Sequence, residues 1–118
     1  NQLKMDIPSD ISFDSGRSEV KGDFSRVLDR FASSLRDNPN TDVRIVGHTD
    51  NTGSDAINNP LSVDRATSTR NYLTARGVSN ARIRVEGQGS YQPIASNSTP
   101  DGRARNRRVE IFVGERQN

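Results

Sequence analysis

The sequence contains no cysteine, which excludes disulfide bonds, iron–sulfur clusters and zinc sites built on thiolates. This absence fits the cytosol and the periplasm equally well. The chain also has only one histidine, His48. A single histidine without a second histidine or a cysteine makes a poor metal site, so we expect His48 to support the structure. We predict no metal ion and no cofactor.

Long apolar runs are absent too. None approaches the ~18 residues of a membrane-spanning helix, and the chain does not open with the basic and then apolar segment of a signal peptide. The first residue is Asn1 rather than Met, so we expect the chain to be a piece of a longer protein. Membrane attachment would then come only from a segment upstream of Asn1.

Aromatic residues are few, with four Phe, two Tyr and no Trp. Arginines gather at Arg103, Arg105, Arg107 and Arg108, a density that could suggest nucleic-acid binding. Three of the four Phe lie in predicted core patterns, so bases would find no stacking platform, and we predict no nucleic-acid partner. We expect Arg103 and Arg108 to stabilise the fold by pairing, and Arg107 to face a ligand.

The chain has 118 residues and a net charge of +2, with 27% charged residues of both signs. This length suits one domain, and the nearly balanced charge lacks the self-repulsion of a disordered chain. We expect residues 1–6 to be a linker remnant, residues 7–114 to form the domain and residues 115–118 to be a tail.

Two segments have the apolar spacing of helices. Apolar side chains recur every three or four residues over 19–37, which predicts the first helix. The second helix is predicted over 60–76, with Asn59 as its N-cap, Pro60 at its first position and Gly77 as a left-handed C-cap.

Short apolar or alternating runs predict four strands. They cover residues 7–13, 43–46, 83–87 and 108–113. Residues 90–106 are rich in Ser, Asn, Pro and Gly and predict an ordered loop with a helical turn at 102–106. The element order predicts an α/β sandwich with βαβαββ topology, in which two main helices pack on a mixed four-stranded sheet.

This topology places the candidate ligand-binding side chains at one edge of the sheet. Ligand crevices in such folds lie beyond the carboxyl ends of parallel strands, and both Asp14 and Asp50 follow predicted strands. Arg107 reaches the same rim if the last strand runs antiparallel. Arg65 lies in the first turns of the second helix, so a zwitterion could sit between Asp50 and Arg65. The alternative is that these two residues form only a salt bridge between loop and helix.

A series of motifs resembles the OmpA-like peptidoglycan-binding domain. The series includes G-H-T-D-N-T-G at 47–53, L-S at 61–62, R-A at 65–66, G-Q-G at 87–89, G-R-A at 102–104 and N-R-R-V-E-I at 106–111. This domain ends OmpA-type porins, forms the globular part of Pal-like and YiaD-like lipoproteins, and is similar to the periplasmic part of MotB. The resemblance extends from about residue 11 to residue 113.

The resemblance implies non-covalent binding of peptidoglycan at the diaminopimelate residue of its stem peptide. The aspartate matching Asp50 takes the side-chain ammonium in this family, and the arginine matching Arg65 takes the neighbouring carboxylate. The other pocket residues implied by the family are Asp14, Thr52, Asn58, Leu61 and Arg107. The resemblance also implies a location in the periplasm, with attachment to the outer membrane, and a homodimer is compatible with it.

Two other functions are the alternatives to a peptidoglycan-binding domain. A cell-wall amidase or glycosidase would need a metal triad or a catalytic pair of carboxylic acids, and the sequence shows neither. An interaction module of a stator or signalling protein would keep the fold with a vestigial peptidoglycan site. Asp50 and Arg65 are both present, which favours a binding domain that anchors an envelope protein to the cell wall.

Overall fold

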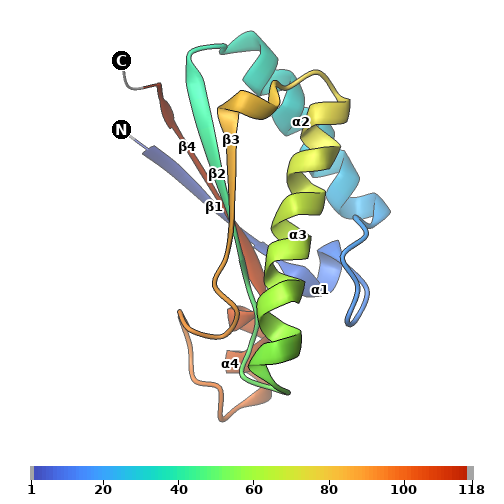
Figure 1. The fold of residues 1–118 in the computed structure, drawn as a ribbon, viewed down its shortest axis with the longest axis vertical. Helices are drawn as coiled ribbons and strands as arrows, with labels where there is room; N and C mark the ends of the chain where they lie inside the picture. Colours follow the sequence, from blue (N-terminus) through green and yellow to red (C-terminus); the bar gives the residue numbers. More distant parts are fainter. Residues whose placement is uncertain (1, 117–118) are drawn as a thin grey trace.

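The computed structural model describes residues 2–116, which form a layer of helices against one sheet (Figure 1). The strands are β1 (Gln2–Pro8), β2 (Thr41–His48), β3 (Ile83–Gly87) and β4 (Arg108–Glu115). The helices are α1 (Ser9–Ser12), α2 (Gly22–Asp37), α3 (Asp55–Ala75) and α4 (Pro100–Asn106), with a 3₁₀ turn at Asn80–Arg82. The two long helices, α2 and α3, lie on the same side of the sheet (Figure 1). The predicted α/β fold, with two main helices on a mixed four-stranded sheet, is therefore confirmed.

The sheet has the strand order β1-β4-β2-β3. β4 pairs antiparallel with both β1 and β2, whereas β2 pairs parallel with β3. The carboxyl ends of β1, β2 and β3 therefore meet the start of β4 at one rim. This arrangement fulfils the condition under which Arg107, directly before β4, reaches the residues that follow β2.

The core lies between the sheet and the two long helices. α2 buries Phe24, Leu28, Ala32 and Leu35. Facing them are the buried strand residues Val43, Ile45, Val109 and Ile111. Phe13 and Phe24 meet edge to face with ring centroids 5.6 Å apart, an arrangement that aromatic pairs favour. Phe13 thereby fixes the segment after α1 against α2 and holds it beside the rim.

Helix α3 approaches the ends of β2 and β3 very closely. A Cβ atom on Gly47 would lie 2.0 Å from the backbone oxygen of Ser62, and one on Gly87 would lie 2.5 Å from the backbone nitrogen of Val63. Only glycine allows this approach. The contact holds the middle of α3, where Arg65 lies about one turn beyond Ser62, close to the residues that follow β2.

The prediction for the N-terminal segment was wrong. Residues 2–8 form β1 and pair with β4 from Gln2↔Gly114 to Pro8↔Arg108, so residues 2–6 are not a linker, and residues 9–12 are helical rather than extended. The alternation of Leu3, Met5 and Ile7 with polar residues already carries the period of a half-buried strand. At the other end, Glu115 belongs to β4 rather than to a tail. Residues 1 and 117–118 lie outside the described residues.

The helix starts also differ from the prediction. α2 begins at Gly22 instead of residue 19, and α3 begins at Asp55 with Ser54 as its N-cap instead of Asn59. Pro60 lies inside α3, where its missing N–H removes only one hydrogen bond near the start of a long helix. Gly77 has φ of 93°, which confirms the left-handed C-cap.

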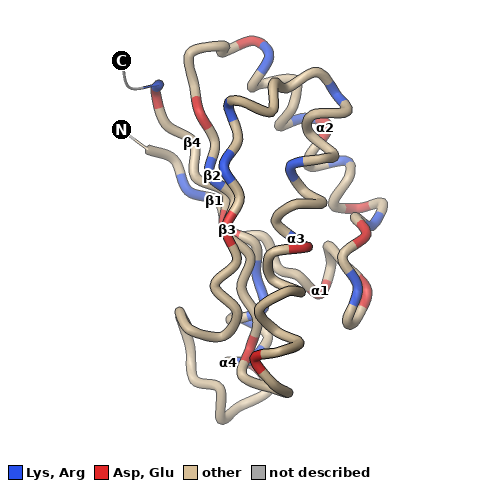
Figure 2. Tube along the Cα trace, viewed as in Figure 1, with Lys and Arg blue, Asp and Glu red and all other residues tan. Residues whose placement is uncertain are grey.

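The face of the sheet opposite the helices carries charged side chains that pair with one another. The Arg44 guanidinium lies 3.2 Å from the Glu86 carboxylate, and the Lys4 ammonium lies 2.9 Å from that of Glu110. Charges of both signs accordingly follow the strands as well as the helices (Figure 2). None of the helices within residues 2–116 combines the length and the apolar character that a membrane-spanning helix needs.

Candidate functional site

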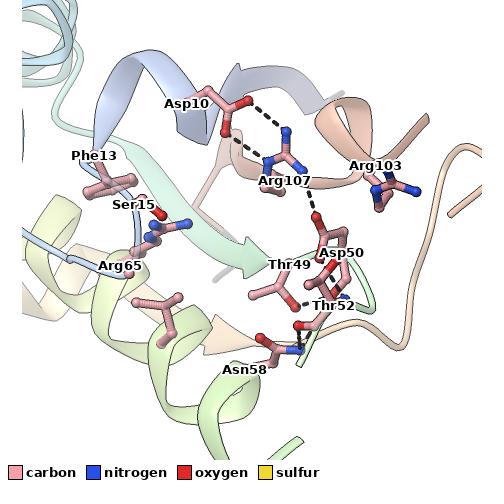
Figure 3. Close-up of a pocket in the computed structure, with 12 residues that line it drawn as sticks. Asp10, Phe13, Ser15, Thr49, Asp50, Thr52, Asn58, Arg65, Arg103 and Arg107 are labelled. Carbon is pink, nitrogen blue, oxygen red and sulfur yellow. Dashed lines mark hydrogen bonds and ion pairs between the residues drawn. The ribbon is translucent and has the colours of Figure 1, made fainter. Parts of the chain in front are cut away.

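A cavity of about 510 Å³ opens at the rim where β2 ends and β4 begins (Figure 3). It is lined by Asp10, Phe13, Ser15, Gly16, Thr49, Asp50, Thr52, Asn58, Leu61, Arg65, Arg103 and Arg107. These residues come from α1 and the segment after it, the loop after β2, helix α3, and α4 with the residue that follows it. The cavity therefore brings together segments that are far apart in the sequence, as the topology predicted.

Asp50 presents an oriented, ionised carboxylate in this cavity. Its side chain accepts a hydrogen bond from the backbone N–H of Thr52 at 2.8 Å and another from Arg107 at 2.6 Å. Burial alone would raise the pKa of Asp50, but the hydrogen bonds from Thr52 and Arg107 outweigh it and hold the pKa below its ordinary value. The residue is only 6% exposed. Asp50 is thus a preorganised acceptor for a positively charged group.

Arg107 joins two carboxylates. Its Nε and Nη2 donate to the two carboxylate oxygens of Asp10, each at 2.9 Å, while its Nη1 donates to Asp50 (Figure 3). The hydrogen bonds from Arg107 lower the pKa of Asp10, and the Asp10 carboxylate in turn is the main cause that raises the pKa of Arg107. Arg107 therefore holds Asp50 in place and neutralises part of the acidic wall.

Arg65 is held differently, entirely by uncharged groups. Its Nε donates to the carbonyl of Arg17 at 2.9 Å, its Nη2 donates to that of Asp14 at 3.3 Å, and its guanidinium lies 5.0 Å from the centre of the Phe13 ring. Burial lowers the pKa of Arg65, yet a guanidinium stays charged at neutral pH. Among residues 2–116, no carboxylate lies within salt-bridge distance of Arg65. The alternative of a structural Asp50–Arg65 salt bridge is therefore not what the structure shows.

Three further predicted residues line the cavity beside Asp50 and Arg65, namely Thr52, Asn58 and Leu61. Asn58 is buried and donates from Nδ2 to the carbonyl of Thr52 at 3.0 Å, which fixes the loop that carries Asp50. Leu61, one turn before Arg65 on α3, gives the cavity an apolar side. Six of the seven predicted site residues thus line one cavity.

Asp14 does not line the cavity, and its prediction as a pocket side chain was wrong. Its carboxylate is 68% exposed and lies 3.6 Å from the Lys21 ammonium, while only its backbone carbonyl faces Arg65. The acid that lines the cavity instead is Asp10 on α1, which the sequence reading missed. The apolar alternation over residues 3–7 could have identified Asp10. A strand over 2–8 places Asp10, rather than Asp14, just beyond the strand's carboxyl end.

His48 and Arg108 belong to the sheet rather than to the cavity. His48 is buried with its Nε2 2.5 Å from Glu110, and Arg108 lies 3.3 Å from the same carboxylate. Both residues support the fold, as expected. In the part of the chain that the structure describes, no group of three or more His, Cys, Asp or Glu side chains is placed to hold a metal ion.

The comparison with known proteins decides the family. A sequence model of the OmpA family matches residues 12–107, which covers most of the chain and every residue of the cavity except Asp10. The chain belongs to the OmpA family.

Relatives with known names agree with this assignment. The peptidoglycan-binding protein ArfA of Mycobacterium tuberculosis is 52% identical over 98 residues, which is 83% of this chain and 30% of ArfA. The probable lipoprotein YiaD of Escherichia coli is 42% identical over 113 residues, which is 96% of this chain and 52% of YiaD. This OmpA-family chain therefore spans about a third to a half of the length of these two relatives.

Among solved structures, the cell wall anchor of the T6SS from Pseudomonas aeruginosa superposes with a TM-score of 0.87. The two chains are 34% identical, and the match covers 97% of this chain and 82% of that one. The fold described above is thus the fold of this family.

Proposed function

We propose that this OmpA-family domain binds peptidoglycan non-covalently by clamping the zwitterionic end of diaminopimelate. The observation that carries the proposal is a buried Arg65 guanidinium without a carboxylate partner in the cavity that also holds the ionised Asp50. An end group with an ammonium and a carboxylate on one carbon needs an acid and a base of this kind. Asp50 would accept from the ammonium, and Arg65 would donate to the carboxylate.

The energetics favour such a ligand. A buried charge is costly unless it is paired, so a carboxylate that reaches Arg65 replaces neutral carbonyl contacts with an ionic hydrogen bond. Bonds of this type contribute about 1.5 to 3 kcal/mol each. Asn58 and Arg107 hold the Asp50 loop before the ligand arrives, which limits the entropy lost on binding.

The names of relatives support the same function. ArfA is named as a peptidoglycan-binding protein, and the structure from Pseudomonas aeruginosa is described as a cell wall anchor. We propose that the protein carrying this domain lies in the cell envelope, in the periplasm and attached to the outer membrane. One relative is named a probable lipoprotein, and another, from Bordetella avium, is named outer membrane protein A. Attachment to a membrane beside a repeating wall would raise the effective ligand concentration, so weak individual binding would suffice.

We further propose that the domain binds without catalysis. A glycosidase needs one carboxylic acid with a raised pKa as a proton donor. The two acids of the cavity have lowered pKa values: Asp10 because Arg107 donates hydrogen bonds to it, and Asp50 because the hydrogen bonds from the Thr52 N–H and Arg107 outweigh its burial. They are therefore suited to binding a cation and poorly suited to donating a proton.

The test is co-sedimentation of the purified domain with isolated cell-wall sacculi that contain diaminopimelate. Asp50→Asn and Arg65→Gln should each lose most of the sedimented fraction while circular dichroism shows the native fold. Asp14→Asn and Arg70→Gln are the matched controls, since neither side chain lines the cavity, and both should sediment like the wild type. Undiminished sedimentation of folded Asp50→Asn and Arg65→Gln would contradict the clamp.

A further inference from the structure

The cavity contains a second arginine whose charge no aspartate meets. Its lining includes three arginines, Arg65, Arg103 and Arg107, but only two aspartates, Asp10 and Asp50. Arg107 donates hydrogen bonds to the carboxylates of both aspartates. Among residues 2–116, no carboxylate lies within salt-bridge distance of Arg103. The proposed clamp uses Arg65, so Arg103 remains as an additional positive charge.

Arg103 is held in a defined position. It lies on α4, where its Nη1 donates to the carbonyl of Asn97 at 3.0 Å. The helix start is capped by Thr99, whose Oγ1 accepts from the N–H of Gly102 at 3.0 Å. One hydrogen bond secures one edge of the planar guanidinium, and the structure gives no bond from Nε or Nη2 to any residue within 2–116. These donors are available to a ligand.

The loop beneath Arg103 is rigid as well. Asn106 is fully buried, and its side chain accepts from the N–H groups of Ile94 and Ala95 and donates to the carbonyl of Ala95 and the amide oxygen of Asn97. Asn97 is also the residue that anchors Arg103. The arginine therefore rests on a scaffold that is ordered before any ligand binds, a property typical of a recognition residue.

Arg103 and Arg65 lie on different sides of Asp50. In the close-up, Arg65 lies on the side of α1 and α3, whereas Arg103, on α4, lies on the opposite side of Asp50 (Figure 3). A single carboxylate that pairs with Arg65 is therefore not the natural partner of Arg103. The arrangement of cation, anion and second cation matches a ligand that carries a carboxylate, an ammonium and a further carboxylate.

We propose that Arg103 is a specificity-determining residue that binds a second carboxylate of the peptidoglycan stem peptide, apart from the one on Arg65. This inference rests on the proposed function. Two carboxylates of the stem have the required chemistry: the free α-carboxylate of the γ-linked glutamate that precedes diaminopimelate, and the carboxylate at the C-terminus of the peptide. Amidation of the carboxylate that Arg103 binds would remove the charge and weaken binding.

Calorimetric titration with three matched stem peptides tests the proposal. One peptide has both carboxylates free, the second has the glutamate amidated, and the third has the C-terminus amidated. We expect the wild-type domain to lose about tenfold in affinity for one of the two amidated peptides, since a charge-assisted hydrogen bond is lost. The peptide that loses affinity identifies the source of the carboxylate.

The same titrations with two arginine variants show whether Arg103 is the residue that binds the carboxylate. Arg103→Gln should bind the free peptide about tenfold more weakly than the wild type and should no longer distinguish it from the amidated peptide. Arg105→Gln is the matched control, because this exposed arginine lies on the same helix and does not line the cavity. Thermal unfolding of both variants checks that α4 remains folded.

The outcomes separate the two proposals. If the wild type binds all three peptides equally, or if Arg103→Gln loses the same affinity for the free and amidated peptides, Arg103 only supports the loop through Asn97 and the inference is wrong. If the wild type binds none of the peptides, the proposed function itself is wrong, and this inference falls with it.

Discussion

Arg107 donates to the Asp50 carboxylate at 2.6 Å, so the aspartate of the proposed clamp is paired with an arginine from the far end of the sequence and not with Arg65. The two arginines, Arg107 and Arg65, therefore have different roles. Arg107 orients Asp50 and favours its ionised form. Arg65 pairs with no carboxylate among residues 2–116, so its charge is available to the proposed ligand. Binding of a zwitterion therefore does not require an existing Asp50–Arg65 pair to break.

Removing Arg107 should destabilise the domain in a pH-dependent manner. Arg107→Met leaves Asp10 and Asp50 without their shared cation, and we expect a loss of about 1 to 3 kcal/mol in the free energy of unfolding at pH 7. Both aspartates have lowered pKa values in the folded wild type. The stability from this pairing is therefore present above the ordinary aspartate pKa and is lost as the pH falls through the folded values.

Urea unfolding at pH 7 and pH 3 checks this expectation. The difference between wild type and Arg107→Met should shrink at the lower pH, where the aspartates begin to protonate. Arg105→Met, two positions before Arg107 and outside the cavity, should match the wild type at both pH values. A difference that does not change with pH would show that Arg107 acts through packing instead of charge.

His48 should make the domain less stable in mildly acidic solution. Burial and the nearby Arg108 lower the pKa of His48, although Glu110 and Asp6 oppose them, and the buried Nδ1 has no hydrogen-bond partner among residues 2–116. The unfolded chain therefore binds a proton at higher pH than the folded one. The free energy of unfolding should fall below about pH 6.5, by no more than about 1.4 kcal/mol per pH unit.

The measurement compares the wild type with His48→Gln between pH 7 and pH 5. Because His48 is the only histidine, the variant should lose the pH slope in this window while its amide can still donate to Glu110. Equal slopes for the two proteins would assign the effect to other groups.

Gly47→Ala should be severely destabilising. The added methyl group would lie 2.0 Å from the Ser62 carbonyl oxygen, so α3 would have to move away from β2. We expect a loss of about 3 kcal/mol or more, at the upper end of overpacking changes, and weaker ligand binding because Arg65 moves with the helix. Gly22→Ala is the control, since its new methyl group meets nothing within 4 Å and the native melting temperature should be kept. Equal melting temperatures for both variants would contradict the close approach of α3.

The sequence predicted those parts of the fold that local chemistry determines. The third strand was predicted with the bounds that β3 has, Ile83–Gly87, and Gly77 ends α3 as predicted. The start of α3 was placed too late because Pro60 resembles a first helical residue, and only the tertiary structure reveals that it is tolerated one turn further in.

The sequence could predict those site residues whose positions follow from the order and direction of the strands. Asp50 follows β2 and Arg107 precedes β4, so the antiparallel strand order places both at one rim, and the contact of α3 with β2 adds Arg65 to the same cavity. The bridge from Arg107 to both Asp10 and Asp50 depends on the orientation of side chains that are far apart in the sequence, which no local pattern encodes. Asp14 was predicted because it follows the strand expected at 7–13 and because the family resemblance implies it, whereas β1 ends at Pro8 and Asp10 lines the cavity.

The most direct test of the clamp is calorimetric titration of the domain with a stem peptide containing meso-diaminopimelate, beside the same peptide with lysine in its place. The two peptides differ only in the carboxylate that Arg65 is proposed to bind. We expect measurable binding of the diaminopimelate peptide and at least about tenfold weaker binding of the lysine peptide, since one charge-assisted hydrogen bond is lost. Equal binding of both peptides, or binding of neither by the folded domain, would contradict it.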